Sequence, residues 1–337
     1  MKALLVDVDS RIANLALMKL STFHKSRGNT VALHLHRSGR GFKREVPTDA
    51  DKAYVSSLFT WNLEETKRIL AALVAAGVEV EVGGTGIDHG RQPQDRILLP
   101  PWIEGLAPDY DLYGADYAVG FCNRGCTRSC TFCDVPLKEG KIRTDRYRPP
   151  WTWVPDGFRK ALLLDNDIAL YENPQLFEIL GWFRDSGVKC SITQGWDLRC
   201  TTPERAALLA ELKPWDYRFT DRILYTAWDY PGIEPFVRRG LRMLIDAGMR
   251  PRDIRVYMIV GHDPRTRGPT PVGDPNERAS ALHRFRVLWE EFGTYPFVMK
   301  FNNRKDDPWL NAFARWGNRP ALFKSFPFEE YRRRGTT

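Results

Sequence analysis

Four of the six cysteines lie in one short stretch, Phe121–Val135, which reads FCNRGCTRSCTFCDV. Three of them, Cys126, Cys130 and Cys133, follow the spacing C-x-x-x-C-x-x-C. Thiols this close in sequence pair as disulfides only with strained geometry. Thiolates on one loop instead suit a shared inorganic centre, and sites made of cysteine alone favour zinc or an iron–sulfur cluster. Three thiolates are one fewer than a closed four-ligand site needs, so one coordination position is left for another ligand.

Two simpler interpretations of this stretch stay open. The same cysteines could form a zinc knuckle, in which the metal has only a structural role. They could also be unrelated thiols that are buried separately, since free cysteine is often a core residue.

Composition narrows the class of protein. A chain of 337 residues with 43% hydrophobic residues can form sizeable packed cores, which excludes a disordered or collagen-like chain. No apolar run approaches the roughly 20 residues of a membrane span, and the chain begins with an apolar strand rather than a secretory signal. Clustered rather than dispersed cysteines indicate a reducing compartment. We therefore expect a cytoplasmic protein that is not associated with a membrane.

The net charge of +8 favours an acidic partner, and nucleic acid is the first candidate. Basic residues are concentrated at Lys138–Arg148, Arg238–Arg255 and Arg332–Arg334. A solvated basic surface, or positive charge that helps to hold an anionic cofactor, is the alternative interpretation.

Residues 1–110 are predicted to form an α/β domain with a doubly wound parallel sheet, because short apolar strands alternate with amphipathic helices. The predicted strands are Lys2–Val8, Val31–His34, Ala53–Ser57 and Val78–Val82. One helix is expected from about Arg11 to His24. A second is expected to begin at Asn62, with Glu65 as its capping partner three residues later.

A second α/β series is predicted after the proline-rich segment Gln92–Pro108. Its six strands alternate with helices, which favours a partial (β/α)6 TIM-type barrel over residues 111–301, followed by a C-terminal extension at 302–337. The predicted strands are Tyr117–Phe121, Ala161–Asp165, Val188–Thr193, Arg222–Trp228, Ile254–Val260 and Phe297–Phe301.

Polar residues follow four successive strands of this series. Because ligands of parallel α/β proteins gather at the carboxyl ends of the strands, we expect these residues to contact a ligand. A carboxylate suits a ribose diol or an ammonium group, and an arginine suits a carboxylate. Single members could be ordinary helix caps, but capping alone explains four successive strands poorly. The set consists of Asp165, Asn166, Asp167, Gln194, Asp197, Arg199, Asp229 and Gly261.

The cysteine spacing, together with Phe132 before the last cysteine and the Arg124-Gly125 lead-in, resembles the radical S-adenosylmethionine (SAM) superfamily. The resemblance implies that Cys126, Cys130 and Cys133 hold three irons of a [4Fe–4S] cluster, and that SAM chelates the fourth. It also implies that Phe132 and the polar strand ends line the SAM site, with Asp165–Asp167 receiving the amino group of SAM. A one-electron donor such as a flavodoxin or ferredoxin is implied as a partner.

The runs LLLDND, QGWDLR and VYMIVG, with the cysteine stretch, resemble a branch of this superfamily that has a cobalamin-binding-type N-terminal domain. Cobalamin-dependent members often carry a histidine after the first strand, whereas the loop here, Asp7–Arg11, has none. Bound cobalamin is therefore not expected. Cys122 stands where the branch has a small residue such as threonine, and we interpret it as a strand-end thiol beside the cluster.

The segments that lack cysteine exclude several types of radical SAM enzyme. No cysteine precedes Cys122, so the N-terminal domain cannot hold a second iron–sulfur cluster of the methylthiotransferase type. None follows Cys200, which excludes a C-terminal auxiliary cluster and a C-terminal methyl-carrying cysteine. The predicted function is radical SAM chemistry on a nucleobase in DNA or RNA. The alternatives are the same chemistry on a peptide or small metabolite, and a non-enzymatic nucleic-acid-binding protein stabilised by zinc.

Overall fold

The computed structural model describes residues 1–36, 45–88, 98–143 and 146–334. Residues 92–97 of the predicted linker and residues 144–145 of the first basic segment lie outside the described residues. The chain divides into two compact units, Met1–Gly120 with Trp153–Phe158, and Phe121–Thr152 with Arg159–Thr337. Both units contain helices and parallel sheet, so the predicted mixed α/β class is confirmed. No helix among the described residues is long and apolar enough to cross a bilayer.

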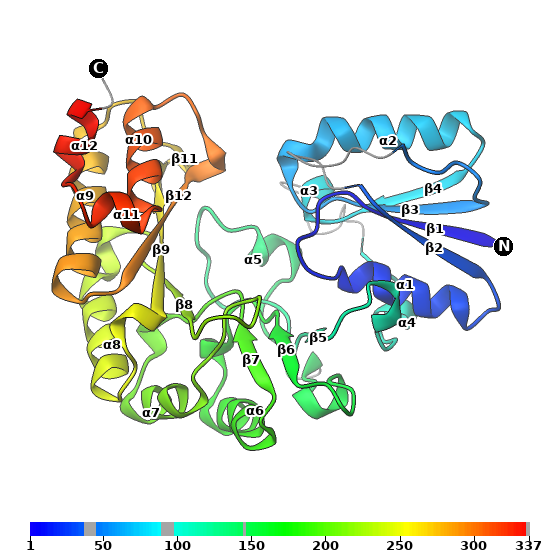
Figure 1. Ribbon diagram of the computed structural model, residues 1–337, viewed down its shortest axis with the longest axis horizontal. Coiled ribbons are helices and arrows are strands. Elements are labelled where there is room, and N and C mark those ends of the chain that lie inside the picture. Colours follow the sequence, from blue (N-terminus) through cyan, green and yellow to red (C-terminus); the bar gives the residue numbers. More distant parts are fainter. Residues whose placement is uncertain (37–44, 89–97, 144–145, 335–337) are drawn as a thin grey trace. The chain divides into compact units, whose positions relative to one another are not determined.

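The first unit is built on a four-stranded parallel sheet of order β2-β1-β3-β4 (Figure 1). The strands are β1 (Lys2–Asp7), β2 (Thr30–Leu35), β3 (Lys52–Ser56) and β4 (Glu79–Gly83). The helices are α1 (Leu15–Lys25), α2 (Leu63–Ala75), α3 (Thr85–Asp88) and α4 (Pro101–Glu104).

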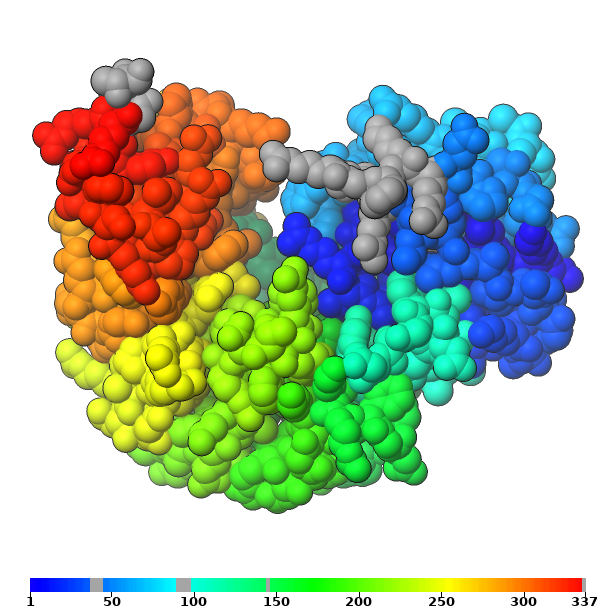
Figure 2. Space-filling view, in the orientation of Figure 1, coloured from blue at the N-terminus to red at the C-terminus, as the bar shows by residue number. Residues whose placement is uncertain are grey.

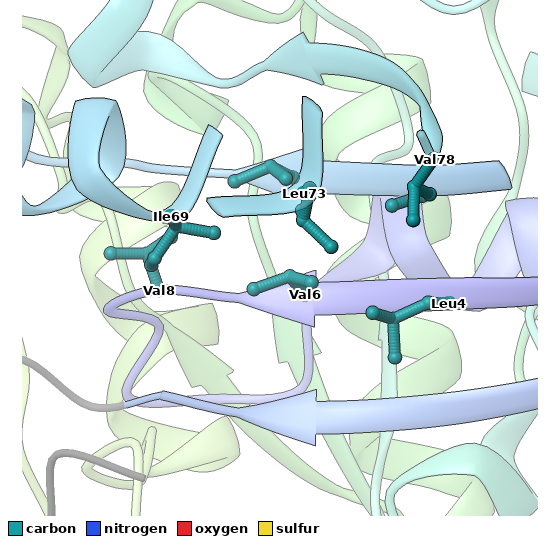
Figure 3. Packing of buried hydrophobic residues seen from close by; sticks show 8 residues of the cluster. Leu4, Val6, Val8, Ile69, Leu73 and Val78 are labelled. Atoms are coloured by element: carbon teal, nitrogen blue, oxygen red, sulfur yellow. The ribbon is translucent and has the colours of Figure 1, made fainter. Parts of the chain in front are cut away.

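β1 has apolar side chains on both of its faces, which explains why helices cover both faces of this sheet. Side chains of a strand point alternately to opposite faces. Leu4 and Val6 pack with Ile69 and Leu73 of α2 (Figure 3), whereas Leu5 packs with Leu17 of α1. A strand buried on both faces reads as a continuous apolar run, as β1 does.

The predicted capping pair of α2 is wrong in its hydrogen bonding. Asn62 occupies the N-cap position, but its side chain caps no backbone amide of the helix. Its Nδ2 donates instead to Asp9 Oδ2 at 2.9 Å. Glu65 accepts from the ring of His36 at 2.9 Å rather than turning back to the N-cap. Both side chains therefore link the helix start to loops that follow β1 and β2.

The second unit contains two groups of parallel strands (Figure 1). In one, β6 (Lys160–Leu163) pairs with β7 (Lys189–Ile192). In the other, β9 (Ile254–Val260) lies between β8 (Leu224–Ala227) and β12 (Tyr295–Lys300). A parallel bridge between Trp196 and Thr226 connects the exit of β7 to β8.

Helices separate the strands of this unit, namely α6 (Asn173–Ser186), α7 (Pro203–Leu212), α8 (Glu234–Asp246) and α9 (Pro275–Arg286), which a π-helical turn η10 (Val287–Glu291) continues. A short antiparallel pair follows β9, formed by β10 (His262–Asp263) and β11 (Gly268–Pro269). The predicted C-terminal extension contains α10 (Pro308–Gly317), α11 (Pro320–Phe323) and α12 (Phe328–Arg334). These residues, red in Figure 2, pack against α9 and β12 through aromatic contacts such as Phe285 with Phe313.

Candidate functional site

The cysteine stretch runs from the end of β5 (Ala118–Gly120) to α5 (Val135–Lys138) and forms no regular secondary structure. Its backbone is held by the segment that follows α5. The amide of Cys126 donates to the carbonyl of Gly140 at 3.0 Å. Gly125 has a φ of +100°, and a Cβ at this position would lie 2.7 Å from the same carbonyl oxygen. Only glycine allows this close approach. Every other residue carries a Cβ, which would clash here, and residues with a Cβ rarely adopt a positive φ.

The thiols of Cys126, Cys130 and Cys133 lie close enough together to affect one another's ionisation. All three are partly exposed, whereas Cys122 and Cys190 are buried. Burial, with smaller contributions from the nearby Cys130 and Cys126, raises the pKa of Cys133 to about 11. Burial also raises the pKa values of Cys126 and Cys130. Three neighbouring thiolates therefore need a cationic centre to stay deprotonated together, which is the property expected of metal-ligating cysteines.

This donor set fits an iron–sulfur cluster in its chemistry, since it consists of thiols alone and leaves one position open. Among the described residues, no three His, Cys, Asp or Glu side chains are already arranged to hold a metal ion. Binding would thus bring the three thiols together around the group, as is common for sites that form with their metal.

Two polar residues after β6 hold the entrance of the cysteine stretch. Asp165 is buried, and its carboxylate accepts from the amides of Cys122 at 2.8 Å and Asn123 at 2.9 Å. It also accepts from the hydroxyl of Tyr171. Asn166 Oδ1 accepts from the amide of Gly125 at 2.8 Å. Both side chains therefore position the backbone that leads to Cys126.

Asp167 lies directly after them and caps a short 3₁₀-helix, η6 (Ile168–Leu170), by accepting from the amide of Ala169. Burial raises its pKa to about 7, with a further contribution from Asp197. The ordinary capping role considered from the sequence thus applies to Asp167.

Asp197, after β7, connects the cysteine stretch to the strand ends. Its Oδ2 lies 2.8 Å from Nη2 of Arg128, which belongs to the stretch, and its Oδ1 lies 2.8 Å from Nε of Arg199. Arg128 also donates to the sulfur of Cys200 at 3.4 Å. Gln194, predicted in the same loop, is exposed at the end of β7. The two arginines place positive charge beside the thiols, and Arg199 lowers the pKa of Cys130 against the effect of burial.

Phe132 has a neighbour that the sequence prediction did not include as a site residue. The ring of His262 meets Phe132 edge to face, with centroids 5.5 Å apart. His262 Nε2 lies 3.3 Å from Oγ1 of Thr131, and its ring packs on Phe301. Burial lowers the pKa of His262, which favours the neutral imidazole. The available signal was its position one residue after Gly261, at a strand end where ligands gather.

Asp229 and Gly261 follow β8 and β9. Asp229 Oδ1 accepts from the amide of Ile259 at 3.1 Å, and burial raises its pKa to about 6. Gly261 has a φ of +79°, and its amide donates to Glu277 Oε1 at 2.8 Å. The sequence prediction also missed Arg284, a fully buried arginine of α9 that lies close to Asp229 and to Glu277. The sequence feature that could have identified Arg284 is a charged residue directly before Phe285, which is buried in the same helix.

Exposed cations lie along the segment that packs on the cysteine stretch. The amide of Arg148 donates to the carbonyl of Cys122 at 2.7 Å, and the carbonyl of Arg143 accepts from Asn123. Lys141, Arg143, Arg146 and Arg148 are exposed. The second unit has 36 Lys and Arg residues against 26 Asp and Glu, a net charge of +10, whereas the first has 14 against 16, a net charge of −2. The basic character of the chain therefore belongs to the unit that carries the cysteine stretch.

In the first unit, a carboxylate of the protein itself, that of Asp9, occupies the topological switch point at the carboxyl ends of the strands. Ligands of open parallel sheets bind where neighbouring connections lead to opposite sides, here beyond β1 and β3. Asp9 accepts at this place from the amides of Leu58 at 2.7 Å and Phe59 at 3.1 Å, and from Ser57 and Asn62. In a ligand-binding crevice these amide and side-chain donors would face the ligand. Here they donate to Asp9 instead.

Asp7, at the end of β1, gives the first unit a pH-dependent stability. Burial raises its pKa above 3.8, although it accepts hydrogen bonds from Ser10 and Tyr113. The folded unit therefore retains a proton that the unfolded chain releases, so this contribution to stability is present below pH 3.8 and is lost as the pH rises through the folded pKa. We expect the difference in unfolding free energy between wild type and Asp7→Asn to fall from pH 4 toward neutrality, where about 4 is the unfolded pKa. Urea denaturation across this range measures it, and a pH-independent difference would contradict it.

A scan against protein-family models finds no match to this chain. A search of curated proteins finds no relative either.

Proposed function

We propose that the protein is a radical SAM enzyme, with a Rossmann-like domain at residues 1–110, a partial (β/α)6 barrel at residues 111–301 and a [4Fe–4S] cluster on Cys126, Cys130 and Cys133. One observation carries the proposal. Three thiols at this spacing lie close enough to affect one another's ionisation. Their loop is held through backbone amides by Asp165 and Asn166, which follow β6, and through the side chain of Arg128 by Asp197, which follows β7. When bound, the reduced cluster would supply one electron to SAM and release methionine and a 5′-deoxyadenosyl radical, which removes a hydrogen atom from a substrate.

The residues around the stretch supply binding and positioning. Asp165 and Asn166 set the path of the backbone toward Cys126 through three amide hydrogen bonds. Arg128 and Arg199, held by Asp197, place two guanidinium groups near the thiols, where a carboxylate ligand such as that of SAM would be favoured. Asp229 can accept from a ribose or an ammonium group, and Phe132 of the cysteine stretch forms an aromatic wall with His262 of β10.

A nucleobase in DNA or RNA is the proposed substrate class. The second unit carries a net +10, and four exposed cations lie on the segment that packs against the cysteine stretch. A phosphate backbone would be attracted to this region, next to the proposed chemistry.

Anaerobic reconstitution tests the enzyme proposal. We expect a brown protein that absorbs near about 400 nm, binds four irons per chain at full loading, and releases 5′-deoxyadenosine from SAM when dithionite is added. A colourless protein that retains zinc would instead support the structural-zinc alternative. Nucleosides from cells with and without the gene, compared by mass spectrometry, then identify the modified base.

Salt dependence tests the substrate class. We expect affinity for a single-stranded oligonucleotide to fall about tenfold or more between 50 and 200 mM salt, because each displaced counterion contributes to the slope. The Lys141→Ala, Arg146→Ala double variant should weaken binding and flatten this slope. Arg184→Ala serves as the control, because this exposed arginine pairs with Asp185 and Glu211 and lies outside the three basic segments. Absence of oligonucleotide binding at the lower salt, with SAM cleavage intact, would favour a peptide or metabolite substrate.

A further inference from the structure

Helix α9 carries a charged side chain in a position where a helix normally presents an apolar one. Arg284 is 1% exposed and lies beside the buried Phe285 and Ala281. Burying a guanidinium is unfavourable unless its donors are satisfied, and an apolar side chain of similar size often serves a purely structural role at least as well. The contacts of Arg284 therefore indicate why a cation lies at this place.

The guanidinium of Arg284 joins the ends of two neighbouring strands. Nη1 donates to the carbonyl of Trp228, after β8, at 2.9 Å and to the carbonyl of Ile259, in β9, at 3.0 Å. Its Nε is buried and has no hydrogen-bond partner among the residues that the structure describes. Because the guanidinium is planar and rigid, these two bonds fix the spacing between the strand ends.

Glu277, at the start of the same helix, extends this connection. Its Oε1 lies 3.7 Å from Nη2 of Arg284 and accepts from the amide of Gly261 at 2.8 Å. The carbonyl of Ile259 accepts from Arg284, while the amide of the same residue donates to Asp229. Asp229 and Gly261, from two different strands, are thus both held through one arginine–glutamate pair.

We propose that Arg284 and Glu277 are positioning residues that set Asp229 and Gly261 in the geometry needed to bind SAM. This inference rests on the proposed function, because it assigns a role toward the ligand of the same site. Neither residue needs to touch SAM. They act through the strand ends, as outer residues do in other sites where their loss weakens the ligand-binding group without removing it.

The test has two readouts on the reconstituted protein. The Kd for SAM is measured by equilibrium dialysis without reductant and should rise in parallel with KM, and reductive cleavage of SAM gives KM and kcat separately. For Arg284→Met we expect the KM for SAM to rise about tenfold or more, with iron content unchanged and kcat within about threefold. Displaced strand ends weaken SAM binding and so raise KM. A merely structural role would instead reduce the fraction of active molecules, which lowers apparent kcat and leaves KM unchanged.

Two further variants keep the test decisive. Arg286→Met is the matched control, since this arginine lies two residues away on α9, is exposed and pairs with Glu329, and its KM should equal that of wild type. Arg284→Lys retains the charge but cannot reproduce the planar fork, so it should also raise KM if Arg284→Met fails to fold. If a folded Arg284 variant has the same KM as wild type, this inference is overturned and the proposed function is unaffected. If the wild-type protein loads iron but neither binds nor cleaves SAM, the proposed function and this inference both fall.

Discussion

Cys130→Ala is expected to lose the iron–sulfur cluster and, with it, all SAM cleavage above the background of the assay. Three thiolates are the minimum for a cluster whose fourth position is left to SAM, so each single replacement removes a ligand that no nearby cysteine replaces. The same outcome is expected for Cys126→Ala and Cys133→Ala. Iron analysis, the visible absorbance and the yield of 5′-deoxyadenosine measure it after anaerobic reconstitution.

Cys190→Ala is the matched control for these variants. Cys190 is buried in β7, and burial raises its pKa well above the ordinary range, so it behaves as a small apolar side chain. We expect its replacement to leave the iron content unchanged. Cys122→Ser tests the remaining member of the stretch, which is also buried. If Cys122→Ser removed the cluster while Cys133→Ala retained it, the ligand assignment would be wrong.

Asp165→Ala is expected to have the largest effect on the ordering of the cysteine stretch. The change leaves the amides of Cys122 and Asn123 and the hydroxyl of Tyr171 without their acceptor. Each orphaned donor costs about 1–3 kcal/mol, although removal of a buried carboxylate whose pKa is raised to about 6 offsets part of this at neutral pH. A net local loss of about 3 kcal/mol follows, equivalent to roughly a hundredfold faster exchange of the two amides.

Hydrogen–deuterium exchange of the Phe121–Gly125 backbone measures this effect directly. Asp185→Ala is the control, because Asp185 lies on α6, is exposed and pairs with Arg184, which is also a surface residue. It should change the exchange of these amides little. We also expect Asp165→Ala to load less iron than wild type. Unchanged protection of both amides in Asp165→Ala would show that this carboxylate does not order the stretch.

The coarse fold was accessible from the sequence because it depends on local periodicity. The apolar run of β1 and the helical spacing on α2 and α6 identify strands and helices, and their alternation indicates parallel sheet. The cysteine spacing identifies candidate ligands in the same way, because all three lie on one loop. These features require no knowledge of which distant segments meet.

The tertiary structure alone decided how the polar residues are used. Asn62 had the sequence of a helix cap, yet its side chain binds Asp9, which is 53 residues away. Asp165 was predicted to contact SAM, and its carboxylate holds the backbone of Cys122, 43 residues earlier. Arg284 gave only the weak signal of a cation on a buried helix face, and its two acceptors lie in other segments. A polar side chain takes whichever partner the packed strand ends bring within about 3 Å, and a local pattern in the sequence does not contain that information.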